Sequence, residues 1–354
     1  MSQIVDVVVI GAGQAGLAAG YHLGRAGVNY LIVDANVEIG GSWHHYWDSV
    51  TLFSPAKYSQ LPGMAFPGDP DQYPNRTEVI AYLQDYADHF NMPVYTDFRV
   101  TDVRQSDGYF HVCDDQGNRV CGWALIVATG AFNRPYIPEI PGVDSYSGCM
   151  MHSYQYRRPD AFAGQRIAVV GSNNSAVQIG YELATVADVS LAIRRPIQWA
   201  PQRFLGKSVF FWFHDTGFDM LPLGYWLHLD DINKVFDDGR YRSAVAAGRP
   251  DTRPMFTAFT ERGVVWGDGL HEEVDTVLFA TGFRPDNVPF LDNLNALCDK
   301  GMPHERGGVS TTVDGLYFVG RFGQLSSASA TLRGVGRDAQ FVVKRLVRDL
   351  RVKG

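Results

Sequence analysis

Residues 11–16 read Gly-Ala-Gly-Gln-Ala-Gly and follow an apolar, β-branched run at residues 4–10. That run predicts a parallel strand buried on both faces, and residues 17–23 predict a helix. In such a turn the first glycine permits a tight reversal, the second lets the backbone approach a pyrophosphate, and the third lets the helix pack on the strand. The helix start adds free N–H groups and the positive end of its dipole. The turn therefore predicts a dinucleotide site, with a purely structural glycine turn as the alternative.

Charged residues at matched distances distinguish this turn from a second, similar one. Asp34 and Arg194 each lie 23 residues beyond the first glycine of their turns, which span residues 11–16 and 171–176. A carboxylate at this position accepts hydrogen bonds from ribose hydroxyls but repels a 2′-phosphate, so Asp34 excludes NADP from the first site. The guanidinium groups of Arg194 and Arg195 match phosphate oxygens, which favours NADPH over NADH at the second site. The alternative is a solvated basic pair at a strand end.

The second turn, Gly-Ser-Asn-Asn-Ser-Ala, lies between a predicted strand at residues 166–170 and a predicted helix at residues 176–183. Asn173 replaces the middle glycine, and asparagine is one of the few residues that tolerate a left-handed backbone. We therefore expect the turn to keep its shape and to gain a side-chain donor. The residues predicted here to bind NADP are Gly171, Ser172, Asn173, Asn174, Ser175, Arg194 and Arg195.

A second glycine pair, Gly40-Gly41, precedes Ser42 and Trp43. In nucleotide-binding flavoproteins such a turn passes near the pyrophosphate and the flavin, which favours FAD over NAD at the first site. Ordinary core packing is the alternative for Trp43. The residues predicted to bind FAD are Gly11, Gly13, Gln14, Ala15, Gly16, Asp34, Ala35, Gly41, Ser42, Trp43, His45, Val103, Ala128, Thr129, Gly130, Gly320 and Ala330.

The composition limits the class of protein. The chain has 354 residues, 45% of them hydrophobic, which is enough for two domains. The net charge of −7 without a long run of either sign gives no indication of nucleic-acid binding. The four cysteines show no CxxC spacing and no metal-ligand pattern, so we expect no metal and a reducing cytoplasm. No basic leader and no apolar run of about 18 residues is present, so we expect neither a signal peptide nor a membrane span.

A repeat indicates how these turns are organised. Residues 124–130 and 276–282 are similar apolar strands that run into a small-residue turn, each at a similar interval after its glycine turn. The predicted fold class is therefore α/β, with two Rossmann-like dinucleotide-binding domains in a disulfide-reductase-like flavoprotein fold, the smaller inserted in the larger. The predicted FAD domain comprises residues 1–157 and 283–354, and the NAD(P)H domain residues 158–282.

Residues 199–260 are rich in aromatic residues and prolines but have no clear period. They contain the run Phe-Phe-Trp-Phe at residues 210–213 and the pair Tyr225-Trp226. Three interpretations stay open: the wall of an apolar substrate cavity, a subunit interface, and plain core packing.

Residues 146–156, Tyr-Ser-Gly-Cys-Met-Met-His-Ser-Tyr-Gln-Tyr, closely resemble the FxGxxxHxxxY fingerprint of class B flavoprotein monooxygenases. Tyr146 replaces the leading phenylalanine. The order of the glycine turns, the two Ala-Thr-Gly segments and this fingerprint also resembles that family over almost the whole chain. The chain is most similar to the short bacterial flavin-containing monooxygenases.

This resemblance implies a reaction. NADPH would reduce FAD, O2 would add at the flavin C4a position, and the hydroperoxide would oxygenate a soft nucleophile (sulfoxidation or N-oxidation) or, as a peroxide, a ketone in a Baeyer-Villiger reaction. It also implies that Ala280, Thr281 and Gly282 contact NADP, and that Ser54 replaces an active-site asparagine as the candidate catalytic residue. The substrate would be a small apolar molecule. Some similar short members of the family lack the arginine at the phosphate-binding position and accept NADH as well. Whether this chain forms a homodimer stays open.

Two other functions are compatible with two nucleotide folds. A pyridine-nucleotide disulfide or flavin reductase shares the architecture, but a disulfide reductase needs a cysteine pair against the flavin. A non-catalytic FAD and NADPH redox sensor would signal through a partner. His152 is either an acid or, as we expect, a brace of the domain linker, while His44, His45 and Asp48 are expected near the flavin, where they either tune it or pack as ordinary polar residues.

Overall fold

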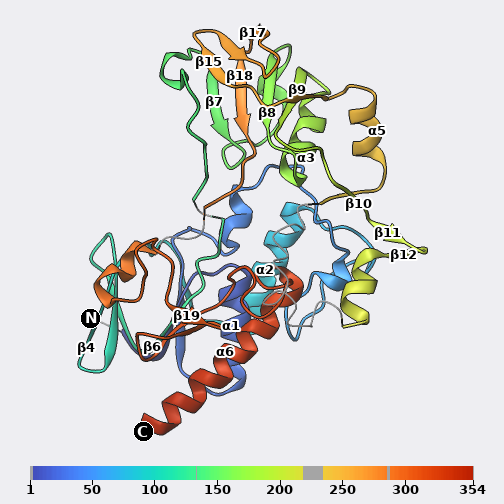
Figure 1. The fold of residues 1–354 in the computed structure, drawn as a ribbon. Coiled ribbons are helices and arrows are strands. Elements are labelled where there is room, and N and C mark those ends of the chain that lie inside the picture. The colour runs from blue at the N-terminus through green and yellow to red at the C-terminus, as the bar shows by residue number, and fades with distance from the viewer. Residues whose placement is uncertain (1–2, 133, 218–233, 285–287, 354) are drawn as a thin grey trace.

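Two separate sheets organise the chain, one in each lobe of the molecule (Figure 1). The structure is a computed structural model that describes residues 3–132, 134–217, 234–284 and 288–353. The lower lobe in Figure 1 contains both ends of the chain, and the upper lobe contains the middle of the sequence.

Apolar runs form the centre of the nine-stranded sheet in the lower lobe. β1 (Gln3–Ile10) pairs in parallel with β2 (Tyr30–Val33) and β6 (Arg119–Val127), and Val7, Val8 and Val9 on it are fully buried. A strand in this position is covered on both faces, which explains its unbroken hydrophobic sequence. The other strands are β3 (Val94–Tyr95), β4 (Val100–Ser106), β5 (Tyr109–Asp114), β19 (Glu305–Arg306), β20 (Val309–Ser310) and β21 (Leu316–Phe318).

Three helices cover the apolar side chains on one face of this sheet, and β4, β5 and η8 (Pro289–Leu294) cover the other face. α1 (Gln14–Arg25) and α6 (Leu332–Lys353) pack against each other, and α2 (Arg76–His89) lies beside α1. α2 starts at a reciprocal cap between Asn75 and Glu78, which satisfies two backbone donors. The short helical turns of the chain are η1 (Gly41–His45), η2 (Ala56–Tyr58), η3 (Val143–Ser145), η4 (Asp160–Phe162), the π-turn η5 (Phe211–Asp215) and η8 (Pro289–Leu294).

The upper lobe repeats the arrangement on a smaller scale. Its five parallel strands have the order β14, β9, β8, β18, β7, and α3 (Asn174–Leu183) connects β8 to β9. These strands are β7 (Cys149–His152), β8 (Arg166–Val170), β9 (Asp188–Ile193), β14 (Asp251–Pro254) and β18 (Thr276–Phe279). The rest of the lobe holds β10 (Trp199–Pro201), β13 (Val235–Asp237), α5 (Arg240–Ala246), β15 (Ala258–Thr260), β16 (Gly263–Val265) and β17 (His271–Glu273). The hairpin of β11 (Arg203–Phe204) and β12 (Lys207–Ser208) lies beside the lower lobe, where it shares a cavity with Lys57 and Asp71 (Figure 1).

The predicted fold class is confirmed: β19 to β21 return to the first sheet after the chain has built the second. The structure differs from the predicted domain ranges at one strand. β7, which the sequence analysis places with the first domain, pairs with β18 at the edge of the second sheet. The exact boundaries stay a prediction. Within the described residues, no helix is long and apolar enough to cross a membrane.

Candidate functional site

The first glycine turn is packed so tightly that two of its positions admit only glycine. Gly11 has a φ of +112°, and a Cβ atom there would lie 2.5 Å from the carbonyl oxygen of Ala128 at the end of β6. A Cβ atom on Gly16 would lie 1.7 Å from the carbonyl oxygen of Gly11. Gly13 caps α1 without a side-chain hydrogen bond, so the first N–H groups of the helix stay available to an anion.

Asp34 is fixed beside this turn at the end of β2. Its Oδ2 accepts the Ala12 N–H at 2.5 Å, and its Oδ1 accepts the backbone and side-chain N–H groups of Asn36, both at 2.8 Å. The carboxyl group is buried. Each carboxylate oxygen has further acceptor capacity, so Asp34 can still receive a ribose hydroxyl.

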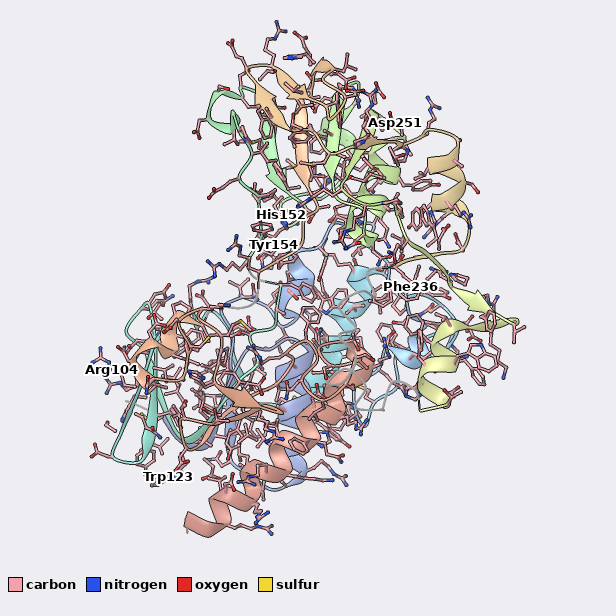
Figure 2. The ribbon with its side chains drawn as sticks, in the orientation of Figure 1. Arg104, Trp123, His152, Tyr154, Phe236 and Asp251 are labelled. Carbon is pink, nitrogen blue, oxygen red and sulfur yellow. The ribbon has the colours of Figure 1, made fainter. Side chains whose placement is uncertain are left out.

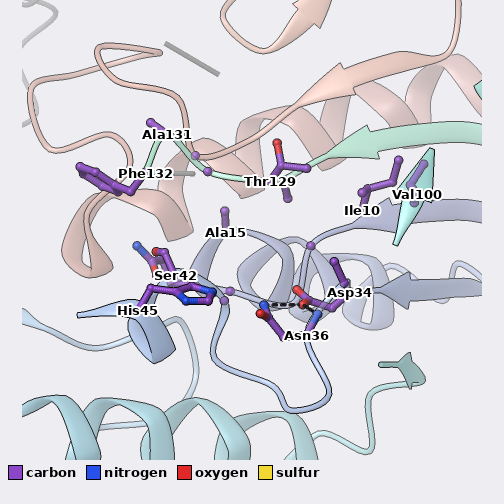
Figure 3. A pocket seen from close by; sticks show the side chains of 18 of the residues that line it. Ile10, Ala15, Asp34, Asn36, Ser42, His45, Val100, Thr129, Ala131 and Phe132 are labelled. Carbon is purple, nitrogen blue, oxygen red and sulfur yellow. Dashed lines mark hydrogen bonds between the residues drawn. The ribbon is translucent and has the colours of Figure 1, made fainter. Parts of the chain in front are cut away.

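A cavity of about 420 Å³ runs along the carboxyl ends of these strands (Figure 3). Asp34 and Asn36 lie at one end of it, and Ser42, His45 and Phe132 at the other. The predicted FAD residues that line it are Gly11, Gly13, Gln14, Ala15, Asp34, Ala35, Gly41, Ser42, His45, Ala128, Thr129, Gly130, Gly320 and Ala330. The cavity is also lined by residues that were not predicted to bind FAD: Ile10, Asn36, Phe98, Arg99, Val100, Ala131, Phe132, Tyr154 and Phe290.

Gln14 ties three distant segments together at this cavity. Its Nε2 donates to the Ala330 carbonyl at 3.1 Å, and its Oε1 accepts the indole N–H of Trp43 at 2.9 Å. Ala330 has a φ of +68°, an uncommon conformation for a residue with a side chain. The start of α1, the turn η1 and the loop before α6 are therefore held in one arrangement.

Three predicted FAD residues lie outside the lining of the cavity. Gly16 allows α1 to pack on β1, and Trp43 contacts Gln14 and the Tyr46 ring. Val103 is fully buried on β4 opposite Val112, while Val100, at the start of the same strand, lines the cavity. Val100 and Val103 are three positions apart, and a bulge between Val100 and Asp102 interrupts the pairing of β4 with β5 between them.

Ser54, the candidate catalytic residue, is buried in the loop before η2. Its hydroxyl lies 2.8 Å from that of Ser59, which also contacts the carbonyl groups of Ser54 and Pro55. The structure thus engages the Ser54 hydroxyl within its own loop and does not bring it into the lining of the 420 Å³ cavity. A catalytic role for Ser54 stays a prediction.

The second glycine turn reproduces the backbone of the first but uses its side chains differently. Gly171 has a φ of +142°, and a Cβ atom there would lie 2.7 Å from the Ala280 carbonyl oxygen. Asn173 caps α3 in an extended conformation with a φ of −101°, so the turn keeps its shape without the left-handed backbone that the sequence suggested, and its side chain makes no capping hydrogen bond. The Asn174 amide donates to the Lys234 carbonyl and accepts the Phe236 N–H, so it holds the start of β13 rather than facing solvent as a free donor.

Arg194 and Arg195 are exposed where β9 ends, on the same lobe as this turn. Within the second glycine turn, Ser172 is half-buried. Ser175 lines a small cavity between the lobes. That small cavity shares Ser42, His45, Phe132 and Tyr154 with the 420 Å³ cavity. The first turn of α3 therefore meets the end of the main cavity that lies opposite Asp34.

His152 braces the connection between the lobes, as expected (Figure 2). Its Nδ1 accepts the Tyr154 N–H at 3.1 Å and its Nε2 donates to the Gly282 carbonyl at 2.9 Å, which requires the neutral ring. Burial lowers the pKa of His152. Thr281 is likewise used for structure, since its hydroxyl donates to the Tyr136 carbonyl.

His45 and Tyr154 form the contact that separates the two cavities. Their rings stack at 4.6 Å with an interplanar angle of 23°. Burial, followed by the positive charge of Arg157, lowers the pKa of His45. The ring is therefore neutral at pH 7. His44, by contrast, turns its Nε2 to the Ile39 carbonyl, and Asp48 pairs with Arg76.

The described part of residues 199–260 includes a contact that joins the lobes. Phe210 is buried, stacks on Phe53 and meets Phe236 at a tilt of 46°, with the Arg333 guanidinium 5.0 Å from its ring centre. Phe210 is thus packed inside the molecule, while the role of the whole segment stays a prediction. Tyr225 and Trp226 lie outside the described residues.

No disulfide joins the four cysteines, Cys113, Cys121, Cys149 and Cys298, all of which lie within the described residues, and none of them lines the 420 Å³ cavity. Among the described residues, no group of histidine, cysteine and carboxylate side chains is arranged to hold a metal ion.

Comparisons with known proteins agree with this architecture. Residues 8–205 match the family model described as pyridine nucleotide-disulphide oxidoreductase. A flavin-containing monooxygenase from Stenotrophomonas maltophilia has 33% identity and a TM-score of 0.83, with 98% of this chain and 99% of that chain covered. An uncharacterized CzcO-like oxidoreductase from Geobacillus kaustophilus is 34% identical, covering 98% and 99% of the two chains. The indole-3-pyruvate monooxygenase YUCCA4 of Oryza sativa subsp. japonica is 29% identical, covering 100% and 90%. The chain belongs to the pyridine nucleotide-disulphide oxidoreductase family and, within it, to the class B flavoprotein monooxygenases.

Proposed function

We propose that this enzyme binds FAD in the 420 Å³ cavity and NADPH at the second glycine turn, and uses O2 to oxygenate a small apolar substrate. The observation that carries the proposal is the meeting of the two sites. Ser175, on the first turn of α3, shares one small cavity with Ser42 and His45 of the FAD lobe. A hydride donor on α3 would therefore reach the end of the cavity remote from Asp34.

The residues of the first lobe fit FAD by their donor chemistry. Gly11 and Gly16 let the turn pack tightly, which brings the start of α1 to the lining of the cavity, where its N–H groups can bind a pyrophosphate. Asp34 offers acceptors for a ribose and disfavours a 2′-phosphate. When bound, reduced FAD supplies the O2 activation, and the protein orients it and excludes water.

The second lobe is suited to a phosphorylated dinucleotide. Gly171 lets the second turn pack as tightly as the first, and exposed Arg194 and Arg195 can engage a 2′-phosphate without losing a buried partner. Ala280, directly after the end of β18, closes the far side of this turn against Gly171.

Aromatic side chains enclose the junction. The rings of Phe132 and Phe283 meet edge to face at 5.5 Å, beside the His45–Tyr154 stack. Apolar walls of this kind keep bulk water from a reactive oxygen donor. We propose a soft nucleophile such as a thioether or an amine as substrate, with a ketone as the second substrate class to test.

The test is a purification followed by a coupled assay. A yellow protein that oxidises NADPH faster when a thioether or a cyclic ketone is added, and that yields a product carrying one atom from labelled O2, would support the proposal. NADPH oxidation that only yields hydrogen peroxide with every substrate would indicate a flavin reductase, and bound flavin without turnover would indicate a sensor.

A further inference from the structure

Asp338, on the second turn of α6, is the most unusual polar side chain of the described molecule. It is 0% exposed, and neither carboxyl oxygen has a hydrogen-bond partner among the described residues. A buried carboxyl group without donors disfavours its own ionised form, and such groups are rare in folded proteins. The burial of the Asp338 carboxyl group without a donor therefore needs an explanation.

The carboxyl group lies behind the loop that closes the dinucleotide cavity. Ser329, itself 1% exposed, interacts with Asp338 without reaching hydrogen-bond geometry. The Ser329 hydroxyl oxygen accepts the N–H groups of Leu325 and Ser326, both at 3.1 Å, and so fixes the loop. The next residue is Ala330, whose carbonyl group holds Gln14 and whose surface lines the cavity.

This environment contains few charges. Burial raises the pKa of Asp338 to about 6, against smaller opposing effects of the Ser329 hydroxyl and the Arg337 charge on the same helix. From α1, His22 faces this region and contacts the Gly336 carbonyl, and burial lowers the pKa of His22. The Asp338 carboxyl group is thus mostly neutral below about pH 6 and mostly ionised at higher pH.

We propose that Asp338 is a positioning residue for the dinucleotide cavity. In its neutral form it lets residues 324–331 pack against α6 and present Ala330 and Gln14 to the ligand. An ionised carboxylate needs water, so in the empty protein it releases this loop. Ligand binding, which requires the packed loop, then takes up one proton at Asp338.

The inference rests on the proposed FAD site and makes its affinity depend on pH. By linkage, a ligand that selects the protonated form binds more weakly as pH rises above the pKa of that group in the free protein. We expect the FAD dissociation constant of the apoprotein to rise about tenfold or more between pH 6 and pH 8.

The experiment compares FAD titrations of wild-type apoprotein, Asp338→Asn and Asp349→Asn at pH 6, 7 and 8. Asp349 is a matched control, since it lies on α6 but is partly exposed and paired with Arg345 and Tyr317. Asp338→Asn should keep the tight affinity across the range, and Asp349→Asn should follow the wild type. Calorimetry in two buffers of different ionisation enthalpy should count a proton taken up by the wild type and by Asp349→Asn, but not by Asp338→Asn.

If the FAD dissociation constant depended on pH equally in the wild type and in Asp338→Asn, the inference would be overturned. Asp338→Leu, which removes the charge and keeps the volume apolar, provides the same test if the amide variant does not fold. Hydrogen exchange of residues 324–331 in the apoprotein separates this inference from the FAD assignment. Loss of protection above pH 6 in the wild type but not in Asp338→Asn would support the loop mechanism even if FAD did not bind.

Discussion

The two glycine turns share a backbone and differ in what surrounds it. Gly11 and Gly171 both have positive φ angles and both face a carbonyl oxygen from the end of a neighbouring strand. Around the first turn, a buried carboxylate, Gln14 and a loop from the C-terminal part of the chain close a long cavity. Around the second, the charged residues that follow the strand are exposed. The same local motif thus serves two purposes.

The surroundings of each turn indicate how long its ligand stays. A ligand enclosed by three segments far apart in sequence must wait for one of them to move before it leaves. A ligand held by exposed arginines at a strand end is bound mainly by charge and exchanges readily. We therefore expect a resident cofactor at the first turn and an exchanging co-substrate at the second.

Gly16→Ala tests the first turn with the largest expected effect. The new Cβ atom would lie 1.7 Å from the Gly11 carbonyl oxygen, so the turn must open or α1 must move. We expect purified protein without flavin absorbance near 450 nm and with a lower Tm. Ala176→Gly makes the opposite exchange at the equivalent position of the second turn, and it should leave the flavin content unchanged.

Asp34→Ala should weaken FAD binding by a smaller amount. The change removes the acceptor for the ribose and leaves the Ala12 and Asn36 N–H groups without their partner. Charge-assisted hydrogen bonds contribute roughly 1.5–3 kcal/mol each, so we expect the FAD dissociation constant to rise about 10- to 100-fold. Flavin fluorescence titration of the apoprotein measures it. Asp85→Ala, on the exposed face of α2, is the control, and an unchanged constant for Asp34→Ala would contradict the assignment.

Arg194→Ala should raise the KM for NADPH by about tenfold, the effect of losing one exposed phosphate contact. The KM for NADH should change much less, because NADH has no 2′-phosphate. Steady-state assays with both coenzymes measure the difference, with the exposed Arg262→Ala as control. An equal rise of the KM for NADPH and for NADH in Arg194→Ala would show that Arg194 does not bind the 2′-phosphate.

His152→Gln should reduce the pH dependence of stability, the smallest of these effects. Burial lowers the pKa of His152 in the folded protein, so below about pH 6.5 the unfolded chain binds the proton more tightly. The free energy of unfolding should therefore fall from pH 7.5 to pH 5.5 in the wild type, and less steeply in the variant. Urea denaturation at both pH values measures this slope. An identical slope in both proteins would show that His152 does not cause the pH dependence of the free energy of unfolding.

The sequence predicts the backbone of both sites because glycine spacing and apolar runs are local signals. Most of the predicted FAD residues line the cavity for this reason, including Asp34 and Ala128. Asn36 could have been found too, since it follows the acidic residue by two positions and bonds to it. Ala330 and Gly320 are predicted from a strand and helix that return late in the chain.

The remaining residues depend on tertiary packing, which has no local signal. Arg99 and Phe98 reach the cavity only because β3 adds to the edge of the sheet beside β2. Tyr154 reaches it because β7 joins the second sheet and directs the chain back toward His45. Nothing in the sequence around Asn174 indicates that its side chain is used to hold β13.

The two chain crossings between the lobes run side by side and are bonded to each other. Pro135 and Phe283 form an antiparallel bridge, the Gly282 carbonyl accepts the Tyr136 N–H at 3.0 Å, and the Arg284 N–H donates to the Arg134 carbonyl at 2.9 Å. A two-stranded ribbon resists stretching and sideways bending far more than twisting about its long axis. Relative motion of the lobes should thus be mainly a torsion about this ribbon, which turns the upper lobe while its distance from the lower lobe stays constant.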